Sequence, residues 1–304
     1  MLAPVSVDPF EAFLDAAWTD HGDNPSTVAE RLARSLDVIA APAHIVPYAR
    51  IVAHVYGEHL ARYEDGIDLL ARLRSVPAWD DSPAMRTAVD RGIAVLRFCA
   101  GDGAVLGTLD RDERIAVLST AASAFAEQKA FRRAIEAYDE ALALARTGLA
   151  EGSPALRALA AGGNNLAAAL ETKPDRDAQE TRGMLTAAQG GLDYWRRAGT
   201  WLEEERAEFR VSESRRSAGD YDAAIHHAER CLAICGEHDA PPFEHFFGAT
   251  ALALAQRSAG LTEEFEASRR LAREWHARVD ESARGWCESA LAQLKDADAP
   301  VRDA

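Results

Sequence analysis

The chain has 304 residues, of which 48% are hydrophobic and only 7% aromatic, so a core is possible but few of its side chains are large. A net charge of −15 and a pI of about 5.1 exclude a general nucleic-acid binder, because phosphate contacts need a cationic surface. No run approaches ~18 apolar residues and the first residues lack a signal-peptide pattern, so we expect a cytoplasmic protein that does not enter the membrane.

Helix signals occur along the whole chain, and strand signals are nearly absent. Alanine is abundant, and it is the best helix former and allows helices to approach closely. Proline follows a capping residue at Asp8-Pro9, Ser82-Pro83 and Ser153-Pro154, which is typical of a helix start. These features predict an all-α chain.

The first predicted helix, residues 8–19, has a stripe of apolar side chains along one side. The stripe consists of Phe10, Phe13, Leu14, Ala17 and Trp18. Such a helix either caps the first repeat of an array or mediates self-association or partner binding. A second helix is predicted over 25–40.

Residues 43–75 read as a degenerate helix pair whose turn is about one residue longer than usual, and another helix is predicted over 82–99. A glycine-rich segment follows at Gly101, Gly103 and Gly107. A phosphate-binding loop would need a preceding strand or a Gly-Lys-Ser/Thr sequence. Neither is present, so we predict a plain loop between helices.

Residues 113–148 contain two helix-period patterns that flank a short break at Gln128–Lys129. The first has Leu118, Ala121, Ala122 and Phe125, and the second has Ala134, Ala137, Tyr138 and Ala141. This order of small and aromatic positions resembles the tetratricopeptide repeat (TPR). The leading Trp of that signature is replaced by Leu118, and its closing Pro by Arg146.

The pattern continues beyond this pair. Helices are predicted at 153–170, 177–199, 201–217, 221–236, 242–258, 261–278 and about 280–295, followed by a disordered tail, DADAPVRDA. The run Asn164-Asn165-Leu166-Ala167 resembles the longer repeat of kinesin light chains, a variant found in bacterial scaffold and regulatory proteins. Equivalent second-helix positions lie 47, 43 and 41 residues apart, more than the ~34 of the short repeat.

The resemblance implies an all-α, right-handed α-solenoid of stacked antiparallel helix pairs with capping helices at both ends. Residues 1–109 would hold N-terminal helices and degenerate repeats, 110–278 the TPR-like array, and 279–304 a capping helix and the tail. We expect these parts to form one continuous solenoid.

In this family the first helix of each pair lines a concave groove. The residues that would face it here are Ser119, Thr120, Asn164, Asn165, Arg206, Phe209 and Arg210. Asparagine amides can hold a peptide backbone, and arginine offers a fork to a carboxylate. The alternative is that these side chains are simply solvated, with Arg210 paired to Glu213 or Glu205.

One sequence cluster has the residue types of a metal site: His227, Cys231, Cys235 and His238. Strung along one helix, these residues span roughly 16 Å and cannot converge on one ion. Cysteine also packs well as a small hydrophobe, so we interpret Cys231 and Cys235 as core residues. We predict no metal and no cofactor, and reduced thiols throughout.

Other candidates for chemistry have simpler explanations. Asp80-Asp81 precedes a helix start and fits capping, since anions offset the positive end of a helix. The tryptophans at packing positions are interpreted as core or inter-repeat filler: Trp195, Trp201, Trp275 and Trp286. No motif of a hydrolase or metalloprotease is present.

The sequence therefore predicts a non-catalytic scaffold that binds a protein or peptide segment, with acidic groups on the segment meeting arginine. Nucleic acid and membrane are not expected as partners. Two alternatives stay open: a TPR-type regulator that senses a signalling peptide or small ligand, and an all-helical enzyme whose active site has no motif.

Overall fold

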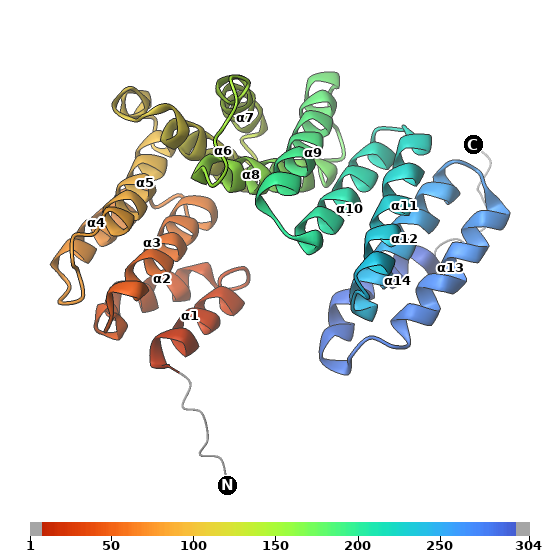
Figure 1. The fold of residues 1–304 in the computed structure, drawn as a ribbon, viewed down its shortest axis with the longest axis horizontal. Helices are drawn as coiled ribbons and strands as arrows, with labels where there is room; N and C mark the ends of the chain where they lie inside the picture. The colour runs from red at the N-terminus through yellow and green to blue at the C-terminus, as the bar shows by residue number, and fades with distance from the viewer. Residues whose placement is uncertain (1–7, 296–304) are drawn as a thin grey trace, which may run out of the picture. The chain divides into compact units, whose positions relative to one another are not determined.

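In a computed structural model, residues 8–295 are described, and they form helices and turns without a strand (Figure 1). The α-helices are α1 (Pro9–Asp20), α2 (Pro25–Arg34), α3 (Ile45–His54), α4 (Tyr63–Arg72), α5 (Pro83–Cys99), α6 (Arg111–Glu127), α7 (Phe131–Ala145), α8 (Pro154–Glu171), α9 (Ala178–Ala198), α10 (Trp201–Ser217), α11 (Tyr221–Glu237), α12 (Pro242–Ser258), α13 (Thr262–His276) and α14 (Glu288–Lys295). Shorter turns of helix are η1 (Leu36–Val38), η2 (Pro42–His44), η3 (Val55–His59), η4 (Leu73–Ser75), η5 (Gly103–Thr108) and η6 (Glu281–Cys287).

Side chains cap the starts of several helices, including α1 and α8. Asp8 accepts a hydrogen bond from the backbone N–H of Phe10 at 2.9 Å, and Ser153 accepts one from Ala155 at 3.3 Å. At α5 no side chain caps the helix, and Asp80 accepts from the N–H of Ser82, the residue before the first helical residue, at 2.9 Å. These contacts place the prolines in the first turn, where the missing N–H costs nothing.

Three helix pairs, α6–α7, α10–α11 and α12–α13, are each joined by a turn of three residues, and their helices pack against each other. The middle residue of each turn has a positive φ: 61° at Lys129, 82° at Gly219 and 76° at Gly260. The next residue donates its N–H to a carbonyl five positions back, for example Ala130 to Phe125 at 2.8 Å. The predicted all-α architecture of stacked helix pairs is confirmed.

The structure differs from the sequence prediction at two connections. The helix predicted over 25–40 ends at Arg34, because the carbonyl of Leu32 accepts from the Tyr48 hydroxyl and from the Ser35 N–H instead of continuing the helix. The first helix of the degenerate pair ends in the π-helical turn η3, which accounts for the longer connection to α4.

By packing, the described chain divides within α8 into two compact units, residues up to Gly162 and residues from Gly163 onward. Unit 1 has a core around Tyr48, Leu70 and Leu96, and unit 2 has one around Phe246 and Leu254. The sequence-based boundaries at 109/110 and 278/279 follow repeat quality rather than packing, and they stay a prediction.

The two ends of the described chain cover neighbouring helices. In unit 1, α1 contacts α2 and α3 and buries Phe10 and Ala17. In unit 2, the predicted final helix is divided into η6 and α14, and its residues Cys287 and Leu294 are buried in the core around α12. Self-association through α1 stays a prediction, and the tail 296–304 lies outside the described residues. Among residues 8–295 no helix is long and apolar enough to cross a membrane.

Candidate binding surface

The helices α10 and α12 of unit 2 lie in parallel register. Arg206 on α10 forms an ion pair with Glu244 on α12, with Nη2–Oε1 and Nε–Oε2 distances of 2.5 and 3.3 Å. One turn further along both helices, the rings of Phe209 and Phe247 meet edge to face with centroids 6.0 Å apart. The two contacts share the same offset in sequence, as expected for first helices of successive repeats.

Arg210 points to a different neighbour. Its guanidinium pairs with Glu171 at the end of α8, and Glu171 also accepts from the Ser214 hydroxyl at 2.6 Å. Burial raises the pKa of Glu171, while Arg210 and Ser214 oppose that shift. The sequence analysis offered Glu213 or Glu205 as the partner of Arg210, and both suggestions are wrong.

A pocket of about 140 Å³ opens beside the Phe209–Phe247 contact. It is lined by Phe209, Glu213, Phe247, Thr250, Ala251, Leu254, Trp286, Ser289, Ala290 and Gln293, which come from α10, α12, η6 and α14. Glu213 is the one carboxylate of this lining, and it pairs with Arg216 at 2.6 Å. The Thr250 hydroxyl donates to the carbonyl of Phe246 at 2.8 Å.

Trp286 is the most exposed large apolar side chain of the described residues, with 78% of its surface accessible. The prediction that it fills the core is wrong. Trp195 is buried as predicted, whereas Trp201 and Trp275 stack on His238 and His245. Sequence reasoning missed Trp286 because it lies in the short turn η6, before α14 begins, so its direction does not obey the period of α14.

The other predicted groove residues have mixed environments. In unit 2, Asn165 is exposed, and Asn164 is partly buried with an Oδ1 that has no hydrogen-bond partner in the structure. In unit 1, Ser119 is fully buried, and the hydroxyl of Thr120 donates to the carbonyl of Ala116 at 2.9 Å. The structure therefore brings together Arg206, Phe209 and Arg210 on α10.

The helix α10 also carries buried carboxylates that sequence reasoning missed. Glu205 accepts from the thiol of Cys231 at 2.7 Å and from that of Cys235 at 3.7 Å. The pKa of Glu205 is raised to about 7, and burial of the carboxyl group makes the largest contribution to this shift. A carboxyl group four residues before Phe209 gave no sequence signal of burial.

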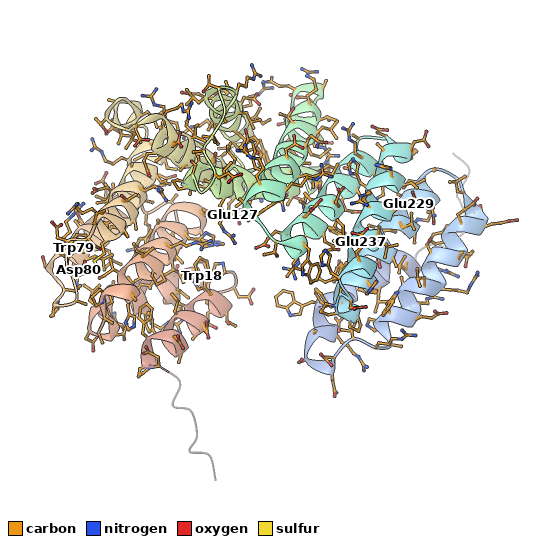
Figure 2. All side chains as sticks on the ribbon, in the orientation of Figure 1. Trp18, Trp79, Asp80, Glu127, Glu229 and Glu237 are labelled. Carbon is orange, nitrogen blue, oxygen red and sulfur yellow. The ribbon has the colours of Figure 1, made fainter. Side chains whose placement is uncertain are left out.

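Glu208 is the second of these carboxylates, and it accepts from Arg196 at 2.7 Å and lies 2.6 Å from Nδ1 of His227. His227 and His238 thus have partners away from the two cysteines. The histidines and cysteines that the sequence analysis singled out along α11 therefore do not converge on one point. On that helix Glu229 and Glu237 are exposed (Figure 2).

The helix pairs, their three-residue turns and the parallel register of α10 and α12 together define the fold. The chain has a TPR-like fold of stacked helix pairs. Position by position, the small packing site at Ala141 on α7 corresponds to Cys231 on α11, and both side chains are fully buried.

The solved structures to which the chain is similar include two proteins with tetratricopeptide-type repeats. A Podosopora anserina protein with nearly identical TPR-like repeats of a kinesin light chain has a TM-score of 0.46 at 12% identity, covering 80% of this chain and 99% of its own. BtubC (BKLC) from P. vanneervenii has a TM-score of 0.47 at 18% identity, with 88% and 91% covered. A STAND protein with a tetratricopeptide repeat sensor from Pyrococcus horikoshii has a TM-score of 0.49 at 14% identity.

In the comparison with the STAND protein, the match covers 90% of this chain but only 42% of the STAND protein. No protein-family model and no curated protein sequence matches the chain. Because all three TM-scores are below 0.5, the assignment rests on the helix pairs and turns described above.

Proposed function

We propose that this TPR-like repeat protein is a non-catalytic binding protein that holds a peptide segment on unit 2. An apolar side chain of the segment enters the pocket between α10, α12 and α14, and a carboxylate of the segment meets Arg206. The observation that carries the proposal is Trp286, an exposed indole at an open apolar pocket. Aromatic anchors of this kind dominate the binding energy of many interfaces.

The size of the pocket favours a single side chain over a small-molecule ligand. Sites for cofactors and drug-sized ligands usually enclose about 300–1,000 Å³. This pocket holds about 140 Å³, which is too little for such a ligand. The volume fits an apolar side chain whose peptide backbone runs along the surface outside.

Charge near the pocket supports a carboxylate as the second point of contact. Arg206 keeps 56% of its side chain exposed although it pairs with Glu244, and it lies one helical turn from Phe209. Arg210 is only 24% exposed and holds Glu171, so we assign it to the fold rather than to the partner. Asn165, exposed on α8, is proposed to contact the backbone of the segment.

A displayed library of random peptides, selected on the full chain, tests the proposal. Selected peptides should share an apolar or aromatic residue with an acidic residue nearby. Trp286→Ala should weaken their binding about 10-fold or more, because it removes the exposed wall of the pocket. Tyr221→Ala is the matched control, since Tyr221 is an exposed aromatic residue on α11 outside the pocket lining.

The contribution of Arg206 is measured separately with Arg206→Gln. A change to Glu is unsuitable, because Glu244 is nearly buried and would face a second carboxylate. Arg206→Gln should weaken acidic peptides more than the same peptides with the acid changed to its amide. If selection gives no shared anchor, or if Trp286→Ala and Tyr221→Ala bind alike, the pocket is not the binding site.

A further inference from the structure

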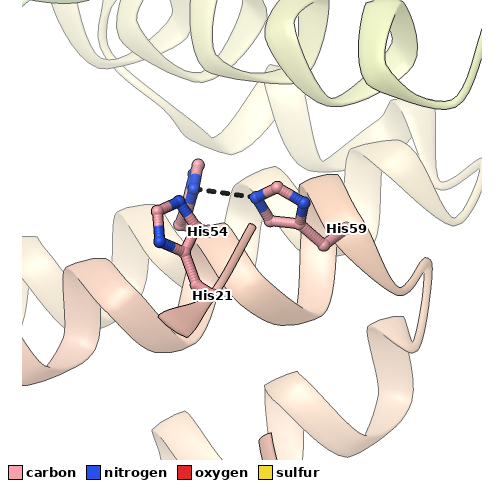
Figure 3. A group of neighbouring side chains, drawn as sticks. All are labelled: His21, His54 and His59. Atoms are coloured by element: carbon pink, nitrogen blue, oxygen red, sulfur yellow. Dashed lines mark hydrogen bonds between the residues drawn. The ribbon is translucent and has the colours of Figure 1, made fainter. Parts of the chain in front are cut away.

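Three histidines from separate segments of unit 1 meet at one place (Figure 3). His21 caps the end of α1, His54 is the last residue of α3, and His59 is the last residue of η3. Their ring centroids are 4.9 Å apart for His21–His54, 5.0 Å for His21–His59 and 4.8 Å for His54–His59. One nitrogen from each ring lies within 4.8 Å of the other two.

Hydrogen bonds on the outer side of two rings fix which nitrogen is available. Nδ1 of His21 lies 2.6 Å from the carbonyl oxygen of Trp18, and Nδ1 of His54 lies 3.0 Å from a carboxylate oxygen of Glu58. A carbonyl and a carboxylate can only accept, so both Nδ1 atoms carry the hydrogen. The lone pairs of both rings are then on Nε2.

The ring of His59 faces the ring of His54, and the Nε2 atoms of the two rings point toward each other. Nε2 of His54 and Nε2 of His59 are 3.1 Å apart (Figure 3). Since the His54 nitrogen is an acceptor, the hydrogen between them belongs to His59. Carbonyl or carboxylate groups behind the imidazoles are the usual outer partners of metal-binding histidines.

We propose that His21, His54 and His59 form a binding site for one divalent ion of the zinc class. Nitrogen ligands of zinc stand about 2.0–2.1 Å from the metal, so tetrahedral ligand atoms are about 3.3 Å apart. The His54–His59 pair already has nearly this separation, and the ligand nitrogen of His21, within 4.8 Å of both, would move closer on binding the ion. His59 keeps its hydrogen by moving it to Nδ1, so no net proton is released.

The surroundings suit a cation with one open coordination position. The carboxyl-terminal ends of α1 and η3 point their negative dipole ends at this place, and Glu58 adds a carboxylate behind His54. All three histidines are partly buried, and the Trp18 ring lies 5.2 Å from that of His21 and 5.1 Å from that of His54. Three protein ligands leave a fourth position for water or an exogenous ligand.

Calorimetric titration of Zn²⁺ into the metal-free full chain tests the site. We expect one ion per chain in the wild type and a loss of affinity of at least about 10-fold in His54→Ala and in His59→Gln. His226→Gln is the matched control, because His226 is an exposed histidine on α11. Circular dichroism of each variant shows whether the fold is kept, and the milder His59→Gln serves if His54→Ala does not fold.

A second measurement separates this site from the buried thiols of unit 2. Glu205, Cys231 and Cys235 also offer atoms within 4.8 Å of one another. Co²⁺ bound at the histidines should show a ligand-field spectrum without thiolate charge transfer, and it should persist in Cys231→Ser/Cys235→Ser. Absence of Zn²⁺ binding, unchanged affinity in both histidine variants, or loss of the ion in the thiol variant would overturn the proposal.

Discussion

Glu205 is a buried carboxyl group without a cationic partner. Its side chain is 1% exposed, one oxygen accepts from two thiols, and the other oxygen has no hydrogen-bond partner in the structure. Burial makes the largest contribution to raising its pKa from 4.5 to about 7, and the nearby carboxylate of Glu244 adds to the shift. The folded protein therefore holds this proton more tightly than the unfolded chain does.

This predicts a loss of stability as pH rises through the interval from about 4.5 to about 7. Below that interval Glu205 is protonated in the folded and in the unfolded chain, so the folded protein buries a neutral carboxyl group and its stability is highest. Above the interval the folded protein must bury a charged carboxylate, and this contribution to stability is lost. The difference amounts to about 3 kcal/mol at most, because one pKa unit is about 1.4 kcal/mol. Glu205→Gln should remove this dependence.

Urea unfolding of the wild type and Glu205→Gln at several pH values measures the effect. The variant should gain in relative stability as pH rises and match the wild type at the acidic end. Glu229→Gln, an exposed change on α11, serves as the control and should follow the wild type. Parallel pH profiles for Glu205→Gln and wild type would contradict the prediction.

At the scale of secondary-structure elements, the close approach of α6 and α8 in unit 1 depends on a glycine. A Cβ at Gly162 would lie 2.6 Å from the carbonyl oxygen of Ser119, which is a backbone atom and cannot rotate away. This contact also explains why Ser119 is buried. The sequence rule that placed Ser119 in a groove took no account of how closely the next helix approaches.

Gly162→Ala should therefore destabilise unit 1 by about 1–3 kcal/mol, the usual cost of overpacking. Gly236→Ala on α11 is the matched control, because its new Cβ would meet no atom within 4 Å. That change should stabilise by about 0.5–1 kcal/mol through helix propensity. The urea midpoints of the two variants should move in opposite directions, and a shift of the same sign would refute the close-approach argument.

At the scale of the whole molecule, each unit has a core of its own. In unit 1, Tyr138 is 1% exposed and donates its hydroxyl hydrogen to the carbonyl of Leu159 at 2.9 Å. In unit 2, Phe246 is fully buried among residues of α12, α13 and α14. In repeat proteins stability is approximately a sum of local terms, so damage to one core need not spread.

Tyr138→Ala should lower the stability of unit 1 by about 3–5 kcal/mol, the usual cost of removing a large buried aromatic side chain. Native-state hydrogen exchange should show faster exchange in α6 and α7 and unchanged exchange in α12. Phe246→Ala should give the reverse pattern. Equal acceleration in both units by either variant would mean that they unfold as one cooperative body.

The sequence determined the helices and their pairing, because both depend on local interactions. Apolar residues at helical spacing predicted α6 and α7, and the helices predicted over 201–217 and 221–236 match α10 and α11 closely. Capping followed from the same kind of signal at Asp8 and Ser153. The resemblance to the TPR family is what predicted that Arg206, Phe209 and Arg210 share one side of this helix.

Only the tertiary structure decided which groups meet across helices. The pairing of Arg206 with Glu244, and the place of Trp286 beside Phe247, depend on the register between elements that are far apart in sequence. His21 approaches His54 and His59 because α1 packs on α3. Contacts of this kind depend on the whole packing of a core, and no local pattern of residues encodes them.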